Sequence, residues 1–431
     1  MSGAGGRARS DESIGVDERD RAVGPERSGA PVRVDVPAVP GATVDDLRAL
    51  FRDDRPLLDV RAPVEFAKGA FPNAVNVPLL TDTERHEVGV RYKRQGQDAA
   101  IALGAELLGE PERARRTALW RAFAEAHPDG ALYCFRGGLR SRIAQAWLAD
   151  AGIELPLVTG GYKAMRSWLI DELERLVSDL ELQLIGGRTG VGKTSLIRRL
   201  RRSVDLEGIA RHRGSSFGAL GEGQPGNIDF ENRVTLAFLR LETGGEQRSA
   251  GARQAEDGLA CRPSVGDRPE RRPSADGPVW LEDEARLIGR VAMPETLVRA
   301  MWRAPLTILE APLATRVANC LDDYAVDLLA RYRHAHGEGD GFEAYAEHHR
   351  SGLDRVRKRL GGENHARAAR LLEDALDTHR ARGEIAGYAP FVEFMLERYY
   401  DPMYDYQLEG KRERVRFAGN AEAILARHGD A

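Results

Sequence analysis

The chain has 431 residues, of which 42% are hydrophobic, and its 63 Lys and Arg nearly balance 67 Asp and Glu, giving a formal net charge of −4. At about 150 residues per domain this length predicts two or three domains, and the near-neutral charge gives no overall nucleic-acid signature. No stretch approaches the roughly 18 consecutive apolar residues of a membrane span, and no apolar signal core begins the chain, so we expect a cytoplasmic protein with no membrane partner.

Two segments contain too few large apolar side chains to fold by themselves. Residues 1–41 are mostly Gly, Ser, Pro, Arg and Asp, and residues 244–278 show neither helical nor strand periodicity. Such segments cannot bury enough apolar surface to offset their chain entropy. We therefore predict a disordered tail at 1–41 and a disordered insertion at 244–278, in which Cys261 is an inert bystander.

Between these segments, short apolar runs alternate with longer amphipathic ones. The pattern predicts strands at 56–60, 74–79, 131–135 and 156–161, a short helix and turn from Pro63, and helices at 140–152 and 162–177. A further strand at 182–187 begins another unit, and the chain from about Leu313 onward has a helical pattern throughout. Alternation of strands and helices is typical of a parallel α/β sheet. We expect an α/β fold with domains at 42–178 and 179–431 and a helical C-terminal part.

A cysteine follows the predicted strand at 131–135, in the sequence YCFRGGLRS. Cys134 stands at the carboxyl end of the strand, and two glycines precede a helix that begins near Arg140. Adjacent glycines let successive backbone N–H groups point inward, and together with the helix N-terminus they form an anion site. The same field stabilises a thiolate, so we expect Cys134 to be nucleophilic with a lowered pKa. The expected oxyanion loop is formed by Arg136, Gly137, Gly138 and Arg140.

The sequence LLDVRAPVEFAKGAFPNAVNVPL at 57–79 resembles the opening signature of rhodanese-type sulfurtransferase domains. Cys134 then falls where those domains carry their sulfur-bearing Cys, and the resemblance implies a rhodanese-like domain at 42–178. Cys134 and Arg140 also have the Cys-x5-Arg spacing of Cys-dependent phosphatases, some of which share the rhodanese fold. The residues alone therefore leave a sulfur or selenium carrier and a phosphatase open. We interpret Asp59, on the first strand, as structural.

A second motif, LQLIGGRTGVGKTSLIRRL, combines an apolar strand, a Gly-rich loop and a helix. It fits G-x4-G-K-T, in which the loop N–H groups wrap a diphosphate, the Lys reaches its terminal oxygens and the Thr binds Mg²⁺. We expect this P-loop to bind a diphosphate through Gly187, Arg188, Thr189, Gly190, Val191, Gly192, Lys193, Thr194 and Ser195. Thr194 and Asp283 are the expected Mg²⁺ ligands, with Glu282 or Glu284 as substitutes for Asp283. The motif does not choose between ATP, GTP and a prenyl diphosphate.

A Gly- and Ser-rich stretch at 212–232 is predicted to be a long functional loop, because long loops in compact domains usually serve a function. An Arg-rich segment comes just before it and is the best basic patch in the chain for contacts with a phosphate backbone. A solvated helix face is the alternative interpretation. The candidate nucleic-acid contacts are Arg198, Arg199, Arg202 and Arg213.

Taken in chain order, a set of motifs resembles the bacterial tRNA 2-selenouridine synthase family. These motifs are CFRGGLRS, GGYKAMRSWL, GGRTGVGKTSL, HRGSSFG, FEN, LEDEARLIG and YYDPMYDYQ. The resemblance covers about 42–243 and 279–425, which is most of the chain predicted to fold. It implies a rhodanese-like parallel-sheet domain joined to a P-loop NTPase-like α/β domain at 179–431.

The resemblance also implies an activity: replacement of sulfur by selenium in 2-thiouridine at the wobble position of certain tRNAs. Geranyl diphosphate first S-geranylates the thio group, and selenophosphate then displaces the geranylthio group. Lys193 and Mg²⁺ would neutralise the departing diphosphate, and Cys134 would carry selenium as an S-selanyl adduct. We expect no tightly bound cofactor, a monomer, tRNA as the partner and a selenophosphate-supplying enzyme as a further partner.

Three other functions stay open on the residues alone. One is a rhodanese-type sulfurtransferase fused to an ATP-binding module, and another is a Cys-dependent phosphatase with the same fusion. The third is a regulatory nucleotide-binding protein whose rhodanese-like domain only binds partners. The nucleophilic character expected of Cys134 argues against the third.

Overall fold

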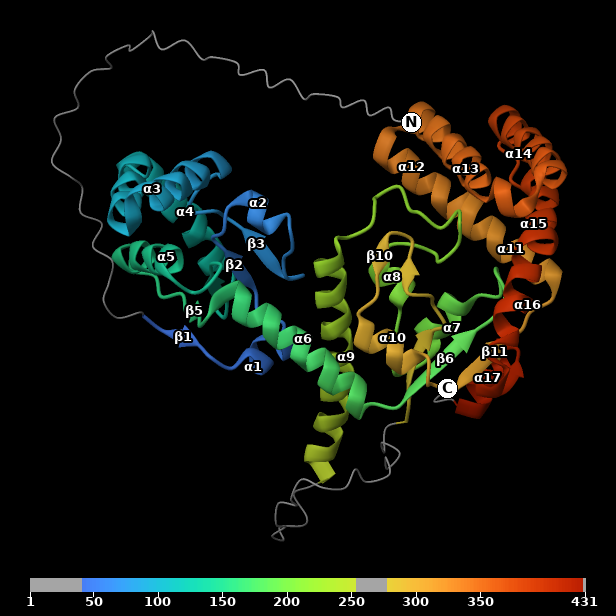
Figure 1. Ribbon diagram of the computed structural model, residues 1–431, viewed down its shortest axis with the longest axis horizontal. Helices are drawn as coiled ribbons and strands as arrows, with labels where there is room; N and C mark the ends of the chain where they lie inside the picture. The colour runs from blue at the N-terminus through green and yellow to red at the C-terminus, as the bar shows by residue number, and fades with distance from the viewer. Residues whose placement is uncertain (1–40, 253–276, 429–431) are drawn as a thin grey trace, which may run out of the picture.

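The described residues of the computed structural model are 41–252 and 277–428, and they form two lobes joined by one long helix (Figure 1). The tail expected at 1–41 lies outside these residues except for Gly41, and so do residues 253–276 of the expected insertion. None of the helices in the described ranges is long and apolar enough to cross a membrane.

The first lobe contains a five-stranded parallel sheet in the order β1-β5-β4-β2-β3. The central strands β2 and β4 are buried along their whole length, as expected of a parallel sheet covered on both faces. The strands are β1 (Thr43–Val44), β2 (Leu57–Asp59), β3 (Ala74–Asn76), β4 (Ala131–Tyr133) and β5 (Leu157–Val158). The helices are α1 (Leu47–Arg52), α2 (Pro63–Phe66), α3 (Asp82–Leu107), α4 (Glu110–Ala126), α5 (Leu139–Asp150) and the joining helix α6 (Gly161–Asp179).

The second lobe contains another five-stranded parallel sheet, in the order β12-β11-β6-β8-β7. Its strands are β6 (Leu182–Gly186), β7 (Ser203–Val204), β8 (Val279–Glu282), β11 (Leu306–Leu309) and β12 (Val415–Gly419). A small antiparallel pair, β9 (Leu287–Ile288) and β10 (Val291–Ala292), lies beside it. The associated helices are α7 (Lys193–Arg199), α8 (Leu206–Ala210), α9 (Asn227–Ala252) and α10 (Glu295–Met301).

Most of the chain after β11 folds as helices around a hydrophobic cluster of its own. The helical elements after β11 are α11 (Leu313–Leu321), the π-helical turn η2 (Asp322–Asp327), α12 (Leu328–His336), α13 (Glu338–Leu360), α14 (Gly362–Arg382), the 3-10 turn η3 (Ala386–Tyr388), α15 (Ala389–Met395), the π-helical turn η4 (Leu396–Tyr400), α16 (Asp401–Glu409), the 3-10 turn η5 (Arg412–Arg414) and α17 (Ala421–His428). Helix α17 packs in a different cluster, with residues of the second sheet. The predicted fold class, two parallel α/β units with a helical C-terminal part, is confirmed.

Two elements differ from the expectations. Strand β12 interrupts the helical C-terminal pattern, because its residues alternate between half-buried and exposed as an edge strand requires. Helix α9 takes in the end of the loop expected at 212–232 and extends into the segment 244–278. It forms because Phe230, Val234 and Phe238 recur every four residues and are all buried.

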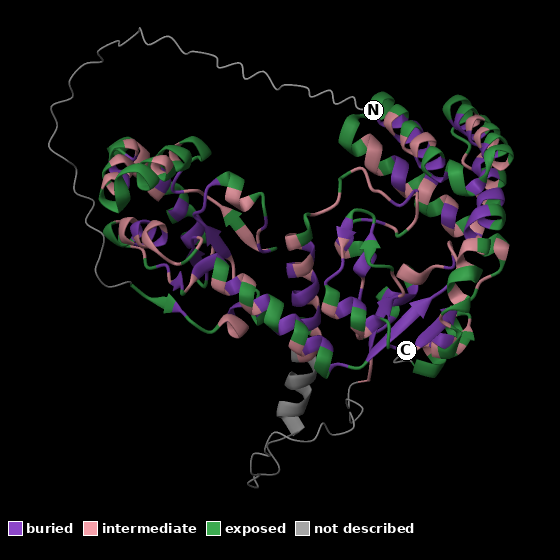
Figure 2. Ribbon diagram, viewed as in Figure 1, coloured by how far each residue is buried: buried purple, intermediate pink, exposed green. Residues whose placement is uncertain are grey.

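The two lobes share one continuous buried apolar cluster. It runs from the first sheet through α6 and α9 to the second sheet, with Leu57, Met165, Leu169, Phe230 and Leu281 among its members. The buried faces of α6 and α9 meet between the sheets (Figure 2). An interface that is large and apolar holds domains in a fixed relation.

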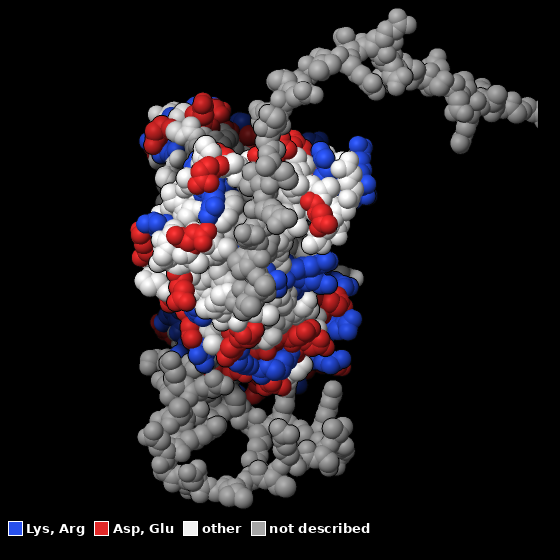
Figure 3. Space-filling view, turned by 90° about the vertical axis from the view of Figure 1, so that its left-hand side faces the viewer, with Lys and Arg blue, Asp and Glu red and all other residues white. Residues whose placement is uncertain are grey.

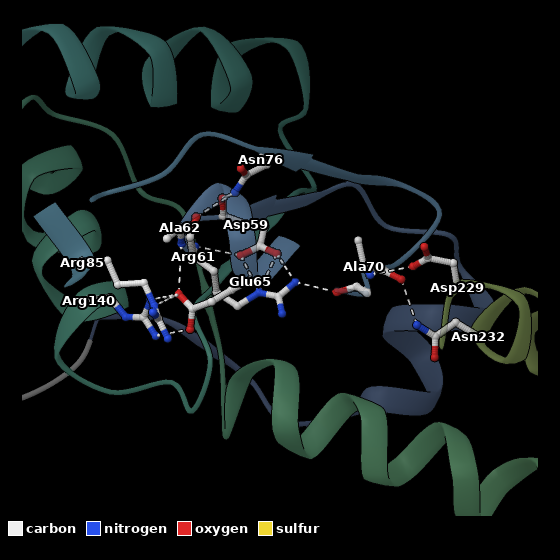
Figure 4. Close-up of polar contacts among 11 residues, drawn as sticks. Asp59, Arg61, Ala62, Glu65, Ala70, Asn76, Arg85, Arg140, Asp229 and Asn232 are labelled. Atoms are coloured by element: carbon white, nitrogen blue, oxygen red, sulfur yellow. Dashed lines mark hydrogen bonds and ion pairs between the residues drawn. The ribbon is translucent and has the colours of Figure 1, made fainter. Parts of the chain in front are cut away.

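Polar contacts from the turn after α2 reinforce this junction (Figure 4). The backbone N–H of Ala70 donates to Asp229 at 2.8 Å, and its carbonyl accepts from Asn232 at 2.8 Å. Both side chains belong to α9. A side chain at Gly69 would collide with Ile228 of the same helix. The turn of the first lobe is therefore fitted closely against the second lobe.

The turn is itself held by a buried ion pair. Asp59 at the end of β2 is fully buried, and Arg61 is 1% exposed. The Arg61 guanidinium pairs with the Asp59 carboxylate at 2.6 Å and donates to the Gly69 carbonyl at 2.9 Å. It also lies 3.9 Å from the ring centroid of Tyr162, at the start of α6. One guanidinium thus connects β2, the interface turn and the joining helix.

Removing this guanidinium should destabilise the protein strongly. Replacing Arg61 by Leu leaves the Asp59 carboxylate buried without its partner, which costs about 3–5 kcal/mol. Chemical denaturation followed by circular dichroism measures the loss. In the control variant Arg115→Leu, the lost pair with Glu112 is an exposed one, so the loss of stability should be much smaller. Equal losses in the two variants would contradict the importance assigned to the Arg61 pair.

Candidate functional site

Cys134 lies directly after β4, in a loop that leads into α5. It is 3% exposed, and its Sγ is 3.1 Å from the Oγ of Ser141. The Ser141 hydroxyl also contacts the Gly138 carbonyl at 3.0 Å. The loop that the sequence predicts between the strand and the helix is present, and the thiol lies within it.

The joining helix α6 fixes the backbone of this loop. The second and third N–H groups of α6, those of Tyr162 and Lys163, donate to the carbonyls of Cys134 and Phe135 at 2.9 and 3.0 Å. A side chain at Gly161, whose φ is +58°, would collide with the Cys134 carbonyl. The Gly160-Gly161 pair therefore has a physical role: it lets the thiol loop and the start of α6 approach at backbone distance.

The loop keeps donors available for an anion. Within the described residues, the backbone N–H groups of Arg136, Gly137 and Gly138 donate to no acceptor. Gly138 is the N-cap of α5 and supplies no side-chain cap. Free N–H groups at a helix N-terminus attract anions.

The side chains of the two arginines of the loop contact groups other than the thiol. Arg140 pairs with Glu65 of α2 at 2.5 Å, and Arg85 of α3 pairs with the same carboxylate at 3.2 Å (Figure 4). Burial opposes ionisation of Glu65, but the two guanidinium groups outweigh it and lower its pKa. Arg136 is exposed, and its guanidinium lies 5.7 Å from the ring centroid of Phe135.

The P-loop runs from the end of β6 to the start of α7, with Gly187, Gly190 and Gly192 at positive φ. Lys193 donates to the Gly187 carbonyl at 3.3 Å, so its side chain curls over the loop. Arg188 points away from the loop and pairs with Asp405 at 2.7 Å. The remaining members of the expected set, Thr189, Val191, Thr194 and Ser195, all line the cavity described below.

Helix α11 supports the P-loop from behind, a role that the sequence did not suggest. Arg316 donates to the Thr189 carbonyl at 2.9 Å, and Asn319 donates to the Gly190 carbonyl at 2.8 Å. Arg316 is 3% exposed and is itself held by Asp401 at 2.5 Å. These side chains fix the two carbonyls of the loop.

The acids near Thr194 differ from the expected one. Asp283 pairs with Lys411 at 2.6 Å, whereas the Thr194 hydroxyl donates to Glu207 at 3.1 Å. A side chain at Gly214 would meet the carboxylates of both Glu207 and Glu284, which shows that these two carboxylates lie close together. Burial and the neighbouring Glu207 carboxylate raise the pKa of Glu284 to about 8. Glu207 was not among the expected residues, since it follows a short strand with no recognisable motif.

Two carboxylates in one buried site need a proton or a cation between them. Among the described residues, no group of three or more His, Cys, Asp or Glu is arranged to hold a metal ion. Mg²⁺ does not need such a group, because it keeps several waters and takes phosphate oxygens as ligands. Thr194, Glu207 and Glu284 therefore fit Mg²⁺ bound together with a diphosphate. The remaining candidate, Glu282, is fully buried and accepts from the Leu206 N–H at 3.0 Å.

A cavity of about 1310 Å³ opens over the P-loop. It is lined by the P-loop, the loop after α8 and both π-helical turns. Arg198, Arg199 and Arg213 line it, although Arg198 pairs with Asp205 and Arg213 with Asp327. Arg202 is not among the lining residues and donates to the Gly277 carbonyl at 2.7 Å.

The structure keeps the two candidate sites apart. The thiol loop belongs to the first lobe, and none of residues 134–140 lines the P-loop cavity. On the side of the molecule that carries α3 and α5, basic and acidic side chains of the described residues are interspersed (Figure 3). The P-loop cavity is mixed as well, because carboxylates such as Glu207, Asp322 and Asp327 line it beside its Arg side chains.

Comparisons with known proteins match both lobes. Residues 43–167 match the rhodanese-like domain, and residues 180–250 and 268–430 match the tRNA 2-selenouridine synthase AAA domain. A tRNA 2-selenouridine synthase of Bordetella bronchiseptica is 46% identical over 385 residues, which cover 89% of this chain and 96% of that protein. Proteins of the same name from Marinobacter nauticus and Pseudomonas fluorescens are each 46% identical, over 88% and 89% of this chain and 95% and 96% of their own lengths.

The shared site of Glu207 and Glu284 predicts a pH dependence of stability. An ordinary Glu has a pKa of 4.5, and folding raises that of Glu284 to about 8. Between these values the folded protein retains a proton that the unfolded chain has lost, so the free energy of unfolding should fall as the pH rises from 4.5 to 8. Chemical denaturation at a series of pH values measures this slope.

Glu284→Gln should flatten the slope, because the variant has no carboxyl to titrate at that position. Glu295→Gln is the control: Glu295 has a lowered pKa, so it titrates below this range and its loss should leave the slope unchanged. An unaltered slope in Glu284→Gln would refute the shared-proton arrangement.

Proposed function

The chain belongs to the tRNA 2-selenouridine synthase family, and from this premise we propose that it converts wobble-position 2-thiouridine in tRNA to 2-selenouridine in two steps, one at each lobe. The observation that carries the proposal is the presence, in one chain, of a thiol loop with free N–H donors and a P-loop with an acid pair. The family match spans both.

The first step is S-geranylation of the thio group by geranyl diphosphate at the P-loop. A sulfur lone pair forms the new S–C bond, the C–O bond to diphosphate breaks with its electron pair leaving on oxygen, and the uridine loses its N3 proton. The loop N–H groups and Lys193 bind the diphosphate and stabilise the charge that develops on it. Mg²⁺ held near Thr194, Glu207 and Glu284 would neutralise further charge on the leaving group.

The second step is displacement of the geranylthio group by selenophosphate at the thiol loop. Alkylation has turned a poor leaving group into a better one. Selenium bonds to C2, the C2–S bond breaks to release geranylthiol, and water splits the Se–P bond to give phosphate. This balance involves no net oxidation or reduction. The N–H groups of Arg136, Gly137 and Gly138 bind the oxyanion beside Cys134. The Cys134 thiol gives its proton to the departing geranylthio group, and the water that splits the Se–P bond returns a proton to the thiolate.

The surroundings of Arg140 favour this assignment over a phosphatase. A Cys-x5-Arg phosphatase needs its Arg turned into the loop to hold the phosphate, whereas Arg140 is engaged by Glu65 on the neighbouring helix. The N–H groups of the loop remain as donors. We propose tRNA contacts at Arg198, Arg199 and Arg213, which line the P-loop cavity, and a selenophosphate-supplying enzyme as the source of the second substrate.

Replacing Cys134 by Ser should stop selenation and leave geranylation intact, because the thiol belongs to a different lobe from the P-loop. Mass spectrometry of nucleosides from tRNA treated with geranyl diphosphate and selenophosphate separates the two products. The matched control is Cys261→Ser, which should retain both reactions. Loss of geranylation in Cys134→Ser would contradict the division between the lobes.

Replacing Lys193 by Ala should reduce geranylation by about 100-fold or more, the usual effect of removing a group that stabilises developing charge. Selenation of tRNA that has been geranylated beforehand should continue. Lys93→Ala, an exposed lysine of α3, serves as the control. Geranylation at the unaltered rate in Lys193→Ala would refute the role of the P-loop.

A further inference from the structure

Helix α13, in the helical part of the second lobe (Figure 1), ends in a strongly basic turn. In this basic turn, residues 355–359, every residue except Val356 is Arg or Lys. Val356 is buried, whereas the four basic residues are exposed. The C-terminus of a helix carries the equivalent of about half a negative charge, so four cations exceed what the helix dipole requires. The turn therefore has positive charge available for a negatively charged partner.

Two of the four cations of the basic turn are engaged within the protein. Arg355 donates to a carbonyl of the loop after α8 at 2.8 Å, and Arg357 pairs with Asp354 at 2.7 Å. Within the described residues, Lys358 and Arg359 have no acidic partner and no other hydrogen-bond acceptor. These two side chains are free to bind an external anion.

The Gly- and Ser-rich loop after α8 holds the basic turn at the P-loop cavity. The Ser216 carbonyl of this loop accepts from Arg355, and the Phe217 carbonyl accepts from His348 Nε2 at 2.9 Å. A side chain at Gly352 would collide with the Phe217 ring, so α13 and the loop pack in direct contact. Because part of the same loop lines the P-loop cavity, these contacts place the end of α13 at the edge of that cavity.

Arg359 itself lines the P-loop cavity, where most of the other arginines are engaged. The engaged pairs are Arg198 with Asp205, Arg213 with Asp327, Arg331 with Asp327, Arg286 with Glu295, and Arg414 with the Met301 carbonyl. Arg199 of α7 resembles Arg359: it lines the cavity, is exposed and has no partner among the described residues. The carboxylates of the cavity thus leave these two guanidinium groups uncompensated.

We propose that Arg359 and Lys358, together with Arg199, bind phosphate groups of the tRNA backbone and hold the anticodon arm at the edge of the P-loop cavity. The inference rests on the proposed function and deepens it, since it adds the end of α13 to the tRNA-binding surface. A cation without a carboxylate partner binds a phosphate without first breaking an ion pair. Contacts of this kind position the RNA and carry no sequence information, so the base remains free to enter the cavity.

The test measures binding of 2-thiouridine-containing tRNA to Lys358→Gln/Arg359→Gln by fluorescence anisotropy at a series of salt concentrations. Each phosphate contact contributes about 0.7–0.9 to the slope of log K against log salt concentration, so the slope should become shallower by about 1.5. The KM for tRNA should rise. The KM for geranyl diphosphate should stay unchanged, because the P-loop binds the diphosphate.

The matched control is Arg370→Gln/Arg382→Gln on α14. Both arginines are exposed and lie outside the cavity lining, and Arg382 belongs to the last turn of its helix. The control therefore removes the same charge and a comparable contact with a helix dipole, and its slope should equal that of the unaltered protein. Arg359→Lys keeps the positive charge and should retain most of the slope.

The outcomes separate this inference from the proposed function. An unaltered slope in Lys358→Gln/Arg359→Gln, or the same change in the control, would overturn the inference while the proposed function stands. A slope lost in Lys358→Gln/Arg359→Gln alone, in a protein that alkylates no tRNA, would support the inference and refute the proposed function. If circular dichroism shows that the double variant does not fold, Arg359→Gln decides the question, with an expected change in slope of about 0.7–0.9.

Discussion

The arrangement of the molecule depends on the buried ion pair between Asp59 and Arg61. The guanidinium lies between β2, the turn that meets α9 and the first residues of α6. A buried charge is tolerated only when its partners are in place. The pair therefore couples the correct folding of β2, the turn and the start of α6 to one another. Through α6 it also reaches the thiol loop, because the N–H of Tyr162 binds the carbonyl of Cys134. The thiol loop is therefore positioned by the same contacts that join the lobes.

The regular part of this structure could be predicted because its signals are local. Each strand of the first sheet from β2 to β5 lies within an apolar run of the sequence. The positions of the glycines identify both anion-binding loops from the sequence alone. Even α9 had a signal, in the regular spacing of Phe230, Val234 and Phe238, which the Gly- and Ser-rich sequence before it obscured. Strand β12 was missed because a short edge strand with an alternating pattern resembles one turn of an amphipathic helix.

The partners of the site residues could not be predicted, because they come from distant parts of the chain. Glu65 engages Arg140 across 75 positions, and Lys411 engages Asp283 across 128. Glu207 becomes the acid next to Thr194 only because α8 follows β7 at the edge of the sheet. Spacing identifies a residue that can carry charge, but the folded topology decides which opposite charge it meets, and so whether it remains available for a ligand.

The separation of the two sites has a consequence for the substrate. A hinge between the lobes would have to open the apolar cluster that runs through α6 and α9, and exposing such surface costs about 25 cal/mol for each Å². The contacts of Ala70 with Asp229 and Asn232 add to that cost. Closure of the lobes on a fixed nucleotide is therefore disfavoured. If the two proposed steps act on one base, the base must move from the P-loop cavity to the thiol loop while the lobes keep their relation.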